Sequence, residues 1–230
     1  MNRIILLEIP FEFGPTKDTI YPVVLQSDDS CVLVDCGYTG FLPRIEKALA
    51  HHGLRGELLT HVVITHHDHD HMGALAALKQ RYPQVIVVAG EKEVPFIDGH
   101  SKPLRLSQSE AMQPNLPPEQ QAFGLAFSKI LKEVTPCPVD LAVKGGDKFN
   151  WCGGCEVIET FGHTAGHISL YLTQQRVMIT GDAAAVQEGR LVLANPEYAL
   201  DQKQAARSLQ KLLQYGATEF LCYHGGRLGG

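Results

Sequence analysis

A dense group of histidines and aspartates directly follows one apolar segment of the chain. Five of the 11 histidines fall within residues 61–71, and two aspartates stand among them. Residues 61–65 read as a β-branched strand, and a helical pattern begins near Gly73. The group therefore occupies a strand-to-helix turn, where side chains two positions apart can point the same way. Because imidazoles and carboxylates are good ligands for zinc, iron and manganese, this turn predicts a metal site.

Further candidate ligands stand at the ends of later predicted strands. They lie in the segments 162–167 (Gly-His-Thr-Ala-Gly-His), 180–182 (Thr-Gly-Asp) and 223–224 (Tyr-His). A sheet presents its strand ends at a common edge, so groups far apart in the sequence can converge there. A flexible histidine-rich loop would bind metal loosely and have no such partners, and their presence disfavours that alternative.

Strands and helices alternate along the chain, which favours an α/β fold in which helices cover the sheet. The expected strands are 4–9, 21–26, 31–35, 61–65, 85–89, 156–160, 168–173, 176–180, 191–194 and 220–223. The expected helices are 42–54, 73–81, 118–133 and 202–215. Asp201 with Gln204 forms a capping-box-like start for the last helix, and Gly216 ends it.

One stretch, at about 95–140, breaks this alternation. It carries several prolines around the helical piece 118–133, and it is too long for a plain loop in a compact domain. We interpret it as a helical, proline-rich insertion that forms a lid. The remaining pattern favours one domain over residues 1–230.

Composition excludes several classes of protein. The net charge of −5 and the pI near 6.1 argue against a nucleic-acid binder. No apolar run reaches the roughly 18 residues of a membrane span. The opening residues are interrupted by Glu8 and Glu12 and predict a strand, not a signal peptide. We expect a soluble, cytoplasmic protein, a monomer or a homodimer, with a small-molecule substrate and no membrane partner.

The six cysteines are too sparse for a disulfide scaffold. Cys152 and Cys155 have the spacing of a redox pair, but a strand pattern follows them where such a pair needs a helix. A zinc knuckle would need a second pair of the same kind. Ordinary reduced thiols beside a turn at Gly153-Gly154 are the favoured interpretation.

Taken in order, the motifs resemble those of the metallo-β-lactamase-fold hydrolases. That family carries Thr-His-x-His-x-Asp-His, then Gly-His-Thr-x-Gly-His, a Gly-Asp and a late histidine. Asp35 matches its early strand-end aspartate. The resemblance covers residues from about 20 to 226 and implies a four-layer αββα sandwich with a dinuclear metal-dependent hydrolase site.

The resemblance also implies two sets of metal ligands. Site one would be His66, Asp68 and His163, and site two would be Asp70, His71 and His224, with Asp182 bridging both. Asp70 would also take or orient the proton of the nucleophile. Asp35 and His167 would orient ligands by hydrogen bonds, although Asp35 can equally tie a turn. His67 and His69 occupy alternate positions of the motif and would not belong to the ligand set.

Asp68 departs from the family pattern, which has a histidine at that place. A carboxylate is harder and more negative than imidazole and favours iron or manganese more than imidazole does. We expect two divalent ions, with zinc as the favoured metal and iron or manganese as alternatives. The sequence alone predicts that Asp68→His retains or tightens zinc binding, because it rebuilds the family's ligand set.

The expected reaction is hydrolysis of a small ester, thioester or lactone. Members of the glyoxalase II type usually carry a helical domain after the last histidine, whereas six residues follow His224 here. Lactonases of the family often have a tyrosine where this chain has Ala185. The alternative of another class is an iron-dependent dioxygenase similar to the persulfide dioxygenases, with His66, His163 and Asp182 as ligands. A member that binds metal without catalysis is a third interpretation.

Overall fold

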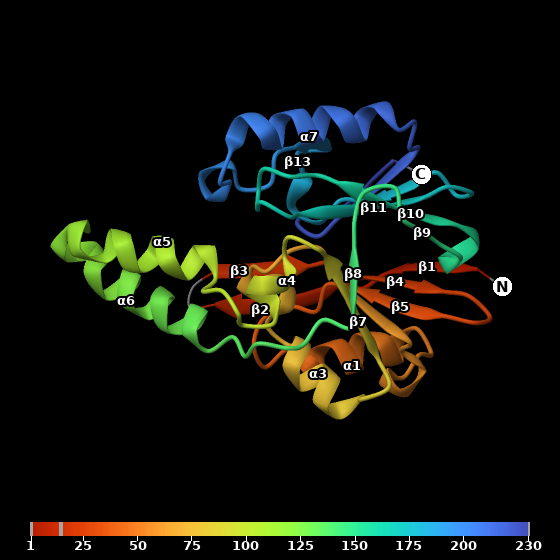
Figure 1. Ribbon diagram of the computed structural model, residues 1–230, viewed down its shortest axis with the longest axis horizontal. Coiled ribbons are helices and arrows are strands. Elements are labelled where there is room, and N and C mark those ends of the chain that lie inside the picture. Colours follow the sequence, from red (N-terminus) through yellow and green to blue (C-terminus); the bar gives the residue numbers. More distant parts are fainter. Residues whose placement is uncertain (1, 14–15, 230) are drawn as a thin grey trace.

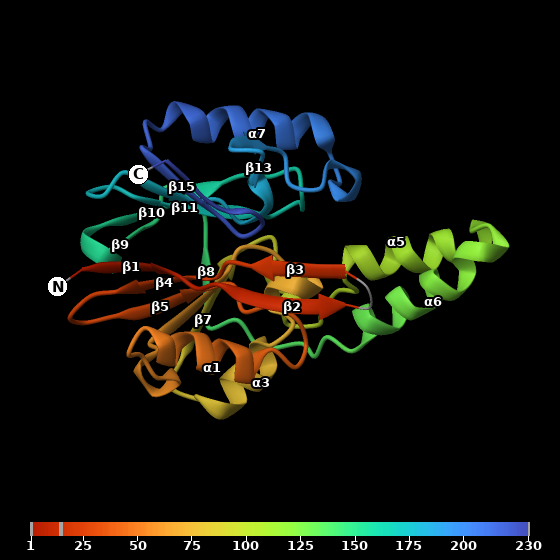
Figure 2. The same cartoon turned by 180° about the vertical axis from the view of Figure 1, so that it is seen from behind.

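The computed structural model describes residues 2–13 and 16–229. Two six-stranded sheets pack face to face, and helices cover the outer face of each (Figure 1). The sequence prediction of an α/β fold with four layers is therefore confirmed. The view from behind shows the same order of layers, with α7 on one outer face and α1 and α3 on the other (Figure 2).

The first sheet begins antiparallel and becomes parallel. Its spatial order is β1 (Arg3–Leu6), β4 (Val23–Gln26), β5 (Cys31–Val34), β6 (His61–Ile64), β7 (Ile86–Gly90) and β8 (Leu141–Val143). The pairs from β5 to β8 are all parallel. The central strands are nearly continuous apolar runs because both of their faces are buried.

The second sheet is mostly antiparallel. Its spatial order is β16 (Gly226–Gly229), β15 (Glu219–Cys222), β12 (Val177–Ile179), β11 (Ile168–Leu172), β10 (Cys155–Glu159) and β9 (Lys148–Phe149). Only its β12–β15 pair is parallel among the strands described. Two small hairpins stand beside the sheets, namely β2 (Ile9–Phe13) with β3 (Thr16–Ile20) and β13 (Ala185–Gln187) with β14 (Arg190–Val192).

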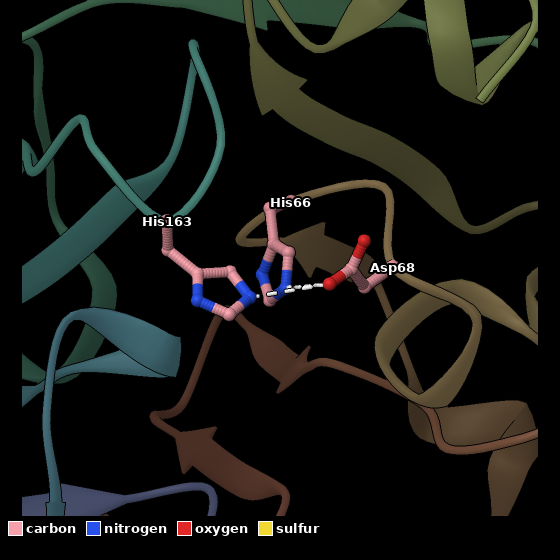
Figure 3. Close-up of side chains that lie close together, drawn as sticks. All are labelled: His66, Asp68 and His163. Carbon is pink, nitrogen blue, oxygen red and sulfur yellow. Dashed lines mark hydrogen bonds and ion pairs between the residues drawn. The ribbon is translucent and has the colours of Figure 1, made fainter. Parts of the chain in front are cut away.

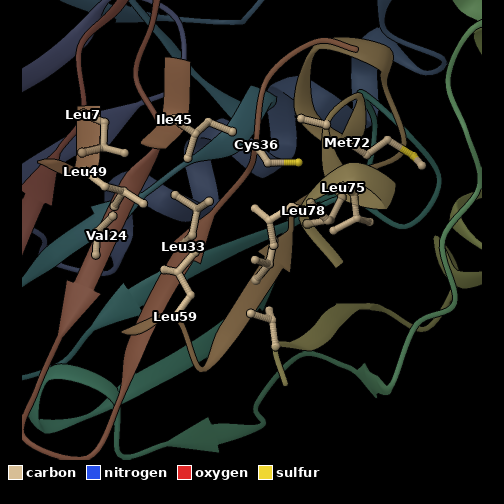
Figure 4. Packing of buried hydrophobic residues seen from close by; sticks show 14 of the residues in the cluster. Leu7, Val24, Leu33, Cys36, Ile45, Leu49, Leu59, Met72, Leu75 and Leu78 are labelled. Carbon is tan, nitrogen blue, oxygen red and sulfur yellow. The ribbon is translucent and has the colours of Figure 1, made fainter. Parts of the chain in front are cut away.

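Three amphipathic helices form the outer layers. The first sheet is covered by α1 (Leu42–His51) and α3 (Leu75–Arg81), and the second by α7 (Gln202–Gln214). Figure 4 shows how side chains of α1 and α3 fill one cluster with the outer face of the first sheet, including Ile45, Leu49, Leu75, Leu78, Val24 and Leu33. At the start of α7, the carboxylate of Asp201 accepts a hydrogen bond from the amide of Gln204 at 2.9 Å, which confirms Asp201 as the N-cap. The reciprocal half of a capping box is replaced, because the side-chain oxygen of Gln204 accepts from Arg207 and the amide of Asp201 donates to Gly162.

Between the sheets lies a second apolar cluster. It joins the alternate residues of the two facing sheets, among them Leu25, Val32, Val63, Val88, Val157, Leu170, Val177 and Leu221. Burial of these side chains holds the two sheets together, and it fixes the relative position of their strand ends.

The stretch at 95–140 contains a helical hairpin that projects from the sandwich (Figures 1 and 2). The hairpin consists of α5 (Leu104–Met112) and α6 (Pro118–Lys132), and the short helix α4 (Val94–Ile97) precedes it. The sequence predicted α6 but not α5. The remaining short helices are α2 (His69–Met72), η1 (Gly56–Leu58), η2 (Gln113–Asn115), η3 (Trp151–Gly153), η4 (Gly181–Ala183) and η5 (Pro196–Tyr198).

Three predicted elements are wrong in their boundaries. The predicted helix 42–54 ends at His51. The predicted strand 4–9 is two strands, because the chain leaves the first sheet after Leu7, whose amide donates to the carbonyl of Pro22, and enters the β2–β3 hairpin. The predicted helix 73–81 is preceded by a separate turn, α2, which carries part of the histidine group. All six cysteines are buried free thiols, and Cys152 lies in the turn between β9 and β10. Among residues 2–13 and 16–229, no helix has the length and apolarity to cross a membrane.

Candidate metal centre

The predicted ligands lie at strand ends along one edge of the sandwich. The first sheet contributes residues directly after β6 and in α2, namely His66, Asp68, Asp70 and His71. The second sheet contributes residues after β10, β12 and β15, namely His163, Asp182 and His224. The structure brings all seven together in three overlapping groups, each with its ligand atoms within 4.8 Å of one another. These groups are His66–Asp68–His163, His66–His71–Asp182 and Asp70–His71–His224.

Asp182 occupies the middle of the arrangement. Its Oδ1 lies 3.2 Å from Nε2 of His71 and 3.5 Å from Nε2 of His224. Its Oδ2 lies 3.5 Å from Nε2 of His163. The carboxylate therefore faces imidazoles of both predicted ligand sets. The first group is drawn in Figure 3, where the rings of His66 and His163 and the carboxylate of Asp68 point toward one another.

Several of these atoms are buried without a hydrogen-bond partner among the described residues. They are Nε2 of His66, His71 and His224 and Oδ1 of Asp182. A buried polar atom left without a partner costs free energy, so a cluster of four at one point calls for a common partner. Neutral imidazole nitrogens and carboxylate oxygens together form a donor set that suits a divalent transition metal. The residues present therefore fit the metal ions that the motif implies.

Asp35 fixes the orientation of two of the rings. Its Oδ2 accepts a hydrogen bond from Nδ1 of His71 at 2.9 Å, which leaves Nε2 of that ring as the free acceptor. The hydroxyl of Thr65 donates to Asp35 at 2.9 Å and lies 3.0 Å from Nδ1 of His66. Asp35 itself has a φ of 60°, a conformation that non-glycine residues rarely adopt. This geometry supports the orienting role over a simple turn.

His167 holds the backbone of Asp182 in place, as Asp35 holds the ring of His71. The backbone amide of Asp182 donates to Nε2 of His167 at 2.9 Å, and Nδ1 of the same ring lies 2.8 Å from the hydroxyl of Thr160. Burial first, and then the neighbouring His66 and His163, lower the pKa of His167 well below its ordinary value. A neutral His167 therefore holds the loop that carries Asp182.

The charges within the centre favour carboxylates that are ionised. Burial opposes ionisation of Asp182, but His224 and His71 outweigh it and hold its pKa well below the ordinary value. Burial acts to lower the pKa of His71, yet the carboxylates of Asp182, Asp35 and Asp70 raise it well above its usual range. Protons therefore compete with a cation for Nε2 of His71.

Solvent reaches the centre from the side of Asp70. The side chains of Asp70 and His224 are 13% and 18% exposed, whereas those of His66 and His71 are fully buried. His69 lies at this opening, where its ring contacts Tyr38 and Phe127 with centroid distances of 5.3 and 5.6 Å. The solvent-facing side of the centre therefore lies beside an aromatic surface.

The sequence missed Glu93, which connects the two ligand loops. It is fully buried, and its Oε1 accepts hydrogen bonds from the hydroxyl of Thr164 at 2.7 Å and from the amide of Gly166 at 2.8 Å. Its Oε2 accepts from the amide of His67 at 2.9 Å and from Nδ1 of the same ring. Glu93 belongs to no motif, and only its place just after β7 connects it with this edge of the sheet.

The sequence also missed Arg105, on α5 of the 95–140 stretch. Its Nη2 lies 2.9 Å from Oδ2 of Asp68, and only 8% of the residue is exposed. The guanidinium carbon lies 4.9 Å from the ring centroid of Tyr198, and Nη1 donates to Gln108 at 3.0 Å. Nothing in the spacing of the motifs points to this residue.

The sequence signature of the metallo-beta-lactamase superfamily matches residues 16–224. The chain belongs to this superfamily. The match includes every residue of the three ligand groups and agrees with the layer order of the fold.

Several curated relatives are hydrolases by name. A hydroxyacylglutathione hydrolase of Ruegeria pomeroyi is 29% identical over 210 residues, which are 88% of this chain and 64% of that protein. A probable metallo-hydrolase of Bacillus subtilis is 27% identical over 220 residues, which are 90% of this chain and 80% of that protein. The chain thus spans less than two thirds of the length of the first relative. Together these matches support a metallo-hydrolase.

Solved structures of the same family share the fold. A metallo-beta-lactamase family protein of Thermus thermophilus superposes with a TM-score of 0.71 at 23% identity, over 98% of this chain and 74% of that one. An archaeal superfamily protein of Sulfolobus tokodaii superposes with a TM-score of 0.68 at 18% identity, over all of this chain and 82% of that one.

Proposed function

We propose that the protein is a dinuclear metal-dependent hydrolase of small esters, thioesters or lactones. The observation that carries the proposal is the set of three buried, unpartnered imidazole nitrogens that converge at the equally unpartnered Oδ1 of Asp182. His66, Asp68 and His163 would hold one ion and Asp70, His71 and His224 the other, with Asp182 between them. Zinc suits this imidazole-rich set, and iron or manganese are the alternatives.

When bound, a pair of divalent cations supplies a nucleophile from water near neutral pH and polarises the carbonyl oxygen of the substrate. The chain's own residues position the groups that take part. Asp70, at the solvent-facing side, lies with Oδ2 3.3 Å from Nε2 of His224. Its carboxylate would take or orient the proton of the attacking water. Asp35 and His167 hold His71 and Asp182 in place during this step.

Hydroxyacylglutathione is the first substrate to test, because it is the one named for the relative from Ruegeria pomeroyi. The aromatic surface of Tyr38 and Phe127 beside Asp70 would contact an apolar part of the substrate. Aryl esters and lactones form the rest of the panel.

The test combines metal analysis with turnover. The purified chain is loaded with zinc, iron or manganese, and its ions per chain are measured before and after chelation. Hydrolysis is then assayed in the absence of oxygen. Two ions per chain with anaerobic hydrolysis would support the proposal, whereas a single bound iron and turnover that requires oxygen would refute it in favour of a dioxygenase.

A further inference from the structure

Asp68 lies in an unusual electrostatic setting for a candidate metal ligand. Its Oδ2 is 3.1 Å from Nε2 of His163 and 3.6 Å from Nε2 of His66, and the same oxygen is 2.9 Å from Nη2 of Arg105 (Figure 3 shows the first two). The Asp68 and Arg105 side chains are each 9% exposed. A carboxylate oxygen has two lone pairs, so it can accept from a guanidinium and still bind a cation.

The ion pair of Asp68 with Arg105 compensates the additional negative charge that Asp68 brings to the centre. Where the family pattern has a neutral histidine, this chain has a carboxylate, beside the further carboxylates of Asp70 and Asp182. An additional buried negative charge is costly unless an opposite charge compensates it. Arg105 supplies that charge. Asp68 and Arg105 together therefore have a net charge of zero, like the neutral histidine that the family pattern has at the position of Asp68.

Arg105 is also held in position. Its guanidinium lies against the ring of Tyr198, and Nη1 donates to Gln108 one turn later in α5. The start of α5 is fixed to the ligand loop by a second contact, because the amide of Leu104 lies 3.4 Å from Nε2 of His67. Two consecutive residues of the inserted helix therefore contact the turn that carries the histidine–aspartate motif.

We propose that Asp68 and Arg105 act as one unit, in which Arg105 is a positioning residue that orients the Asp68 carboxylate as a metal ligand and cancels its charge. The inference rests on the metal centre of the proposed function. It assigns the 95–140 stretch a part in the first metal site. It also reverses the expectation for Asp68→His, since an imidazole there would place its N–H against a guanidinium that offers only donors.

A double-mutant cycle tests the pairing. Asp68→His, Arg105→Gln and the double variant are made in the full chain, with His224→Ala in all members so that Zn²⁺ binding reports the first site. Zn²⁺ affinity is measured by competition with a chromophoric chelator, and circular dichroism verifies folding. Arg105→Gln should weaken Zn²⁺ binding by about 10- to 100-fold, the usual effect of losing a group that orients a ligand. Asp68→His should also weaken Zn²⁺ binding, because the imidazole N–H would face the Arg105 guanidinium.

In the Asp68→His background, Arg105→Gln should instead strengthen Zn²⁺ binding, because the glutamine oxygen can accept from the imidazole N–H and the repelling cation is gone. If Arg105→Gln does not fold, Arg105→Met removes the same charge and should show the same reversal. Lys102→Gln is the control, since this cation of the same insertion is 52% exposed and pairs with Glu110. It should leave Zn²⁺ affinity unchanged.

The outcomes separate the two hypotheses. A parent chain that binds Zn²⁺, with Arg105→Gln having the same effect in both backgrounds, would overturn the pairing and leave the proposed function intact. A parent chain that binds no Zn²⁺, iron or manganese would overturn both.

Discussion

Replacing Glu93 by glutamine should destabilise the protein without removing any candidate ligand. The carboxylate accepts from Thr164 and Gly166 with one oxygen and from His67 with the other. Glutamine retains one acceptor oxygen, and its amide nitrogen then faces the backbone N–H of His67. Since Nδ1 of His67 donates to Glu93 and Nε2 accepts from Leu104, a change of tautomer would satisfy one contact only by breaking the other.

The magnitude follows from the number of buried groups affected. An unsatisfied buried donor costs about 1–3 kcal/mol, and a hydrogen bond to a charged acceptor contributes about 1.5–3 kcal/mol. Losing both at His67 gives a decrease of about 3 kcal/mol in the free energy of unfolding. For a chain of this size, about 2–4 °C per kcal/mol converts that to a fall in Tm of roughly 6–12 °C.

The pH dependence of the free energy of unfolding is a second test of the Glu93→Gln prediction. Burial would raise the pKa of Glu93, but His67 and Thr164 hold it below its ordinary value. A carboxyl with a lowered folded pKa stabilises the protein fully above the unfolded value of about 4.3, and this stabilisation is lost as the pH falls toward the folded pKa. The difference between parent and Glu93→Gln should therefore be largest at neutral pH and shrink below about pH 4.3.

The assay is thermal and urea unfolding of both chains in excess chelator, which separates stability from metal binding. Glu91→Gln is the matched control, because it makes the same chemical change two residues away at an exposed position. A Glu93→Gln variant as stable as Glu91→Gln at neutral pH would refute the connecting role of this carboxylate.

Three further predictions concern the centre itself. Asp182→Ala should lose metal and activity together, and turnover above about a tenth of the parent's, a loss of only about 1.4 kcal/mol, would contradict the bridging role. Gly181→Ala should lower both Tm and metal content, because Gly181 has a φ of +52° and an added Cβ would lie 2.8 Å from Nε2 of His167; unchanged metal content would argue against this close packing. Metal content should fall as the pH drops toward and below about 6.5, because burial lowers but Asp182 and Asp70 raise the pKa of His224, and protons then compete for that ring. Occupancy that stays constant down to pH 5 in a metal-buffered titration would be inconsistent with this competition.

The parts of the fold with strong local signals were predictable. The strand 61–65 and the helix 202–215 lie within two residues of the observed β6 and α7, because β-branched runs and a capped amphipathic pattern act over short distances. The β2–β3 hairpin was missed because Pro10 interrupts the pattern of its first strand and the consecutive charges of Lys17 and Asp18 break the alternation of its second. The helix α5 was missed because its few apolar residues give a weak pattern.

The candidate metal centre also has a part that the sequence predicted and a part that it missed. Its ligand motif can be read from the sequence because metal ligands follow strand ends at fixed spacings. Arg105 could not be found, since it contacts Asp68 from 37 positions away and from an element without a motif. Glu93 was equally hidden, because its importance arises from bonds to two loops, one of them more than 70 residues distant.

The division of the candidate ligands between the two sheets has a consequence for how the protein matures. Four of them belong to the first half of the chain and three to the second, and Asp182 meets His71 only across the junction of the sheets. Neither half alone can offer the whole set, so full metal capture has to follow docking of the halves during synthesis and refolding. Ions bound by the proposed ligands would connect the two halves, so the metal-loaded protein should resist separation of its halves more strongly than the chelated one.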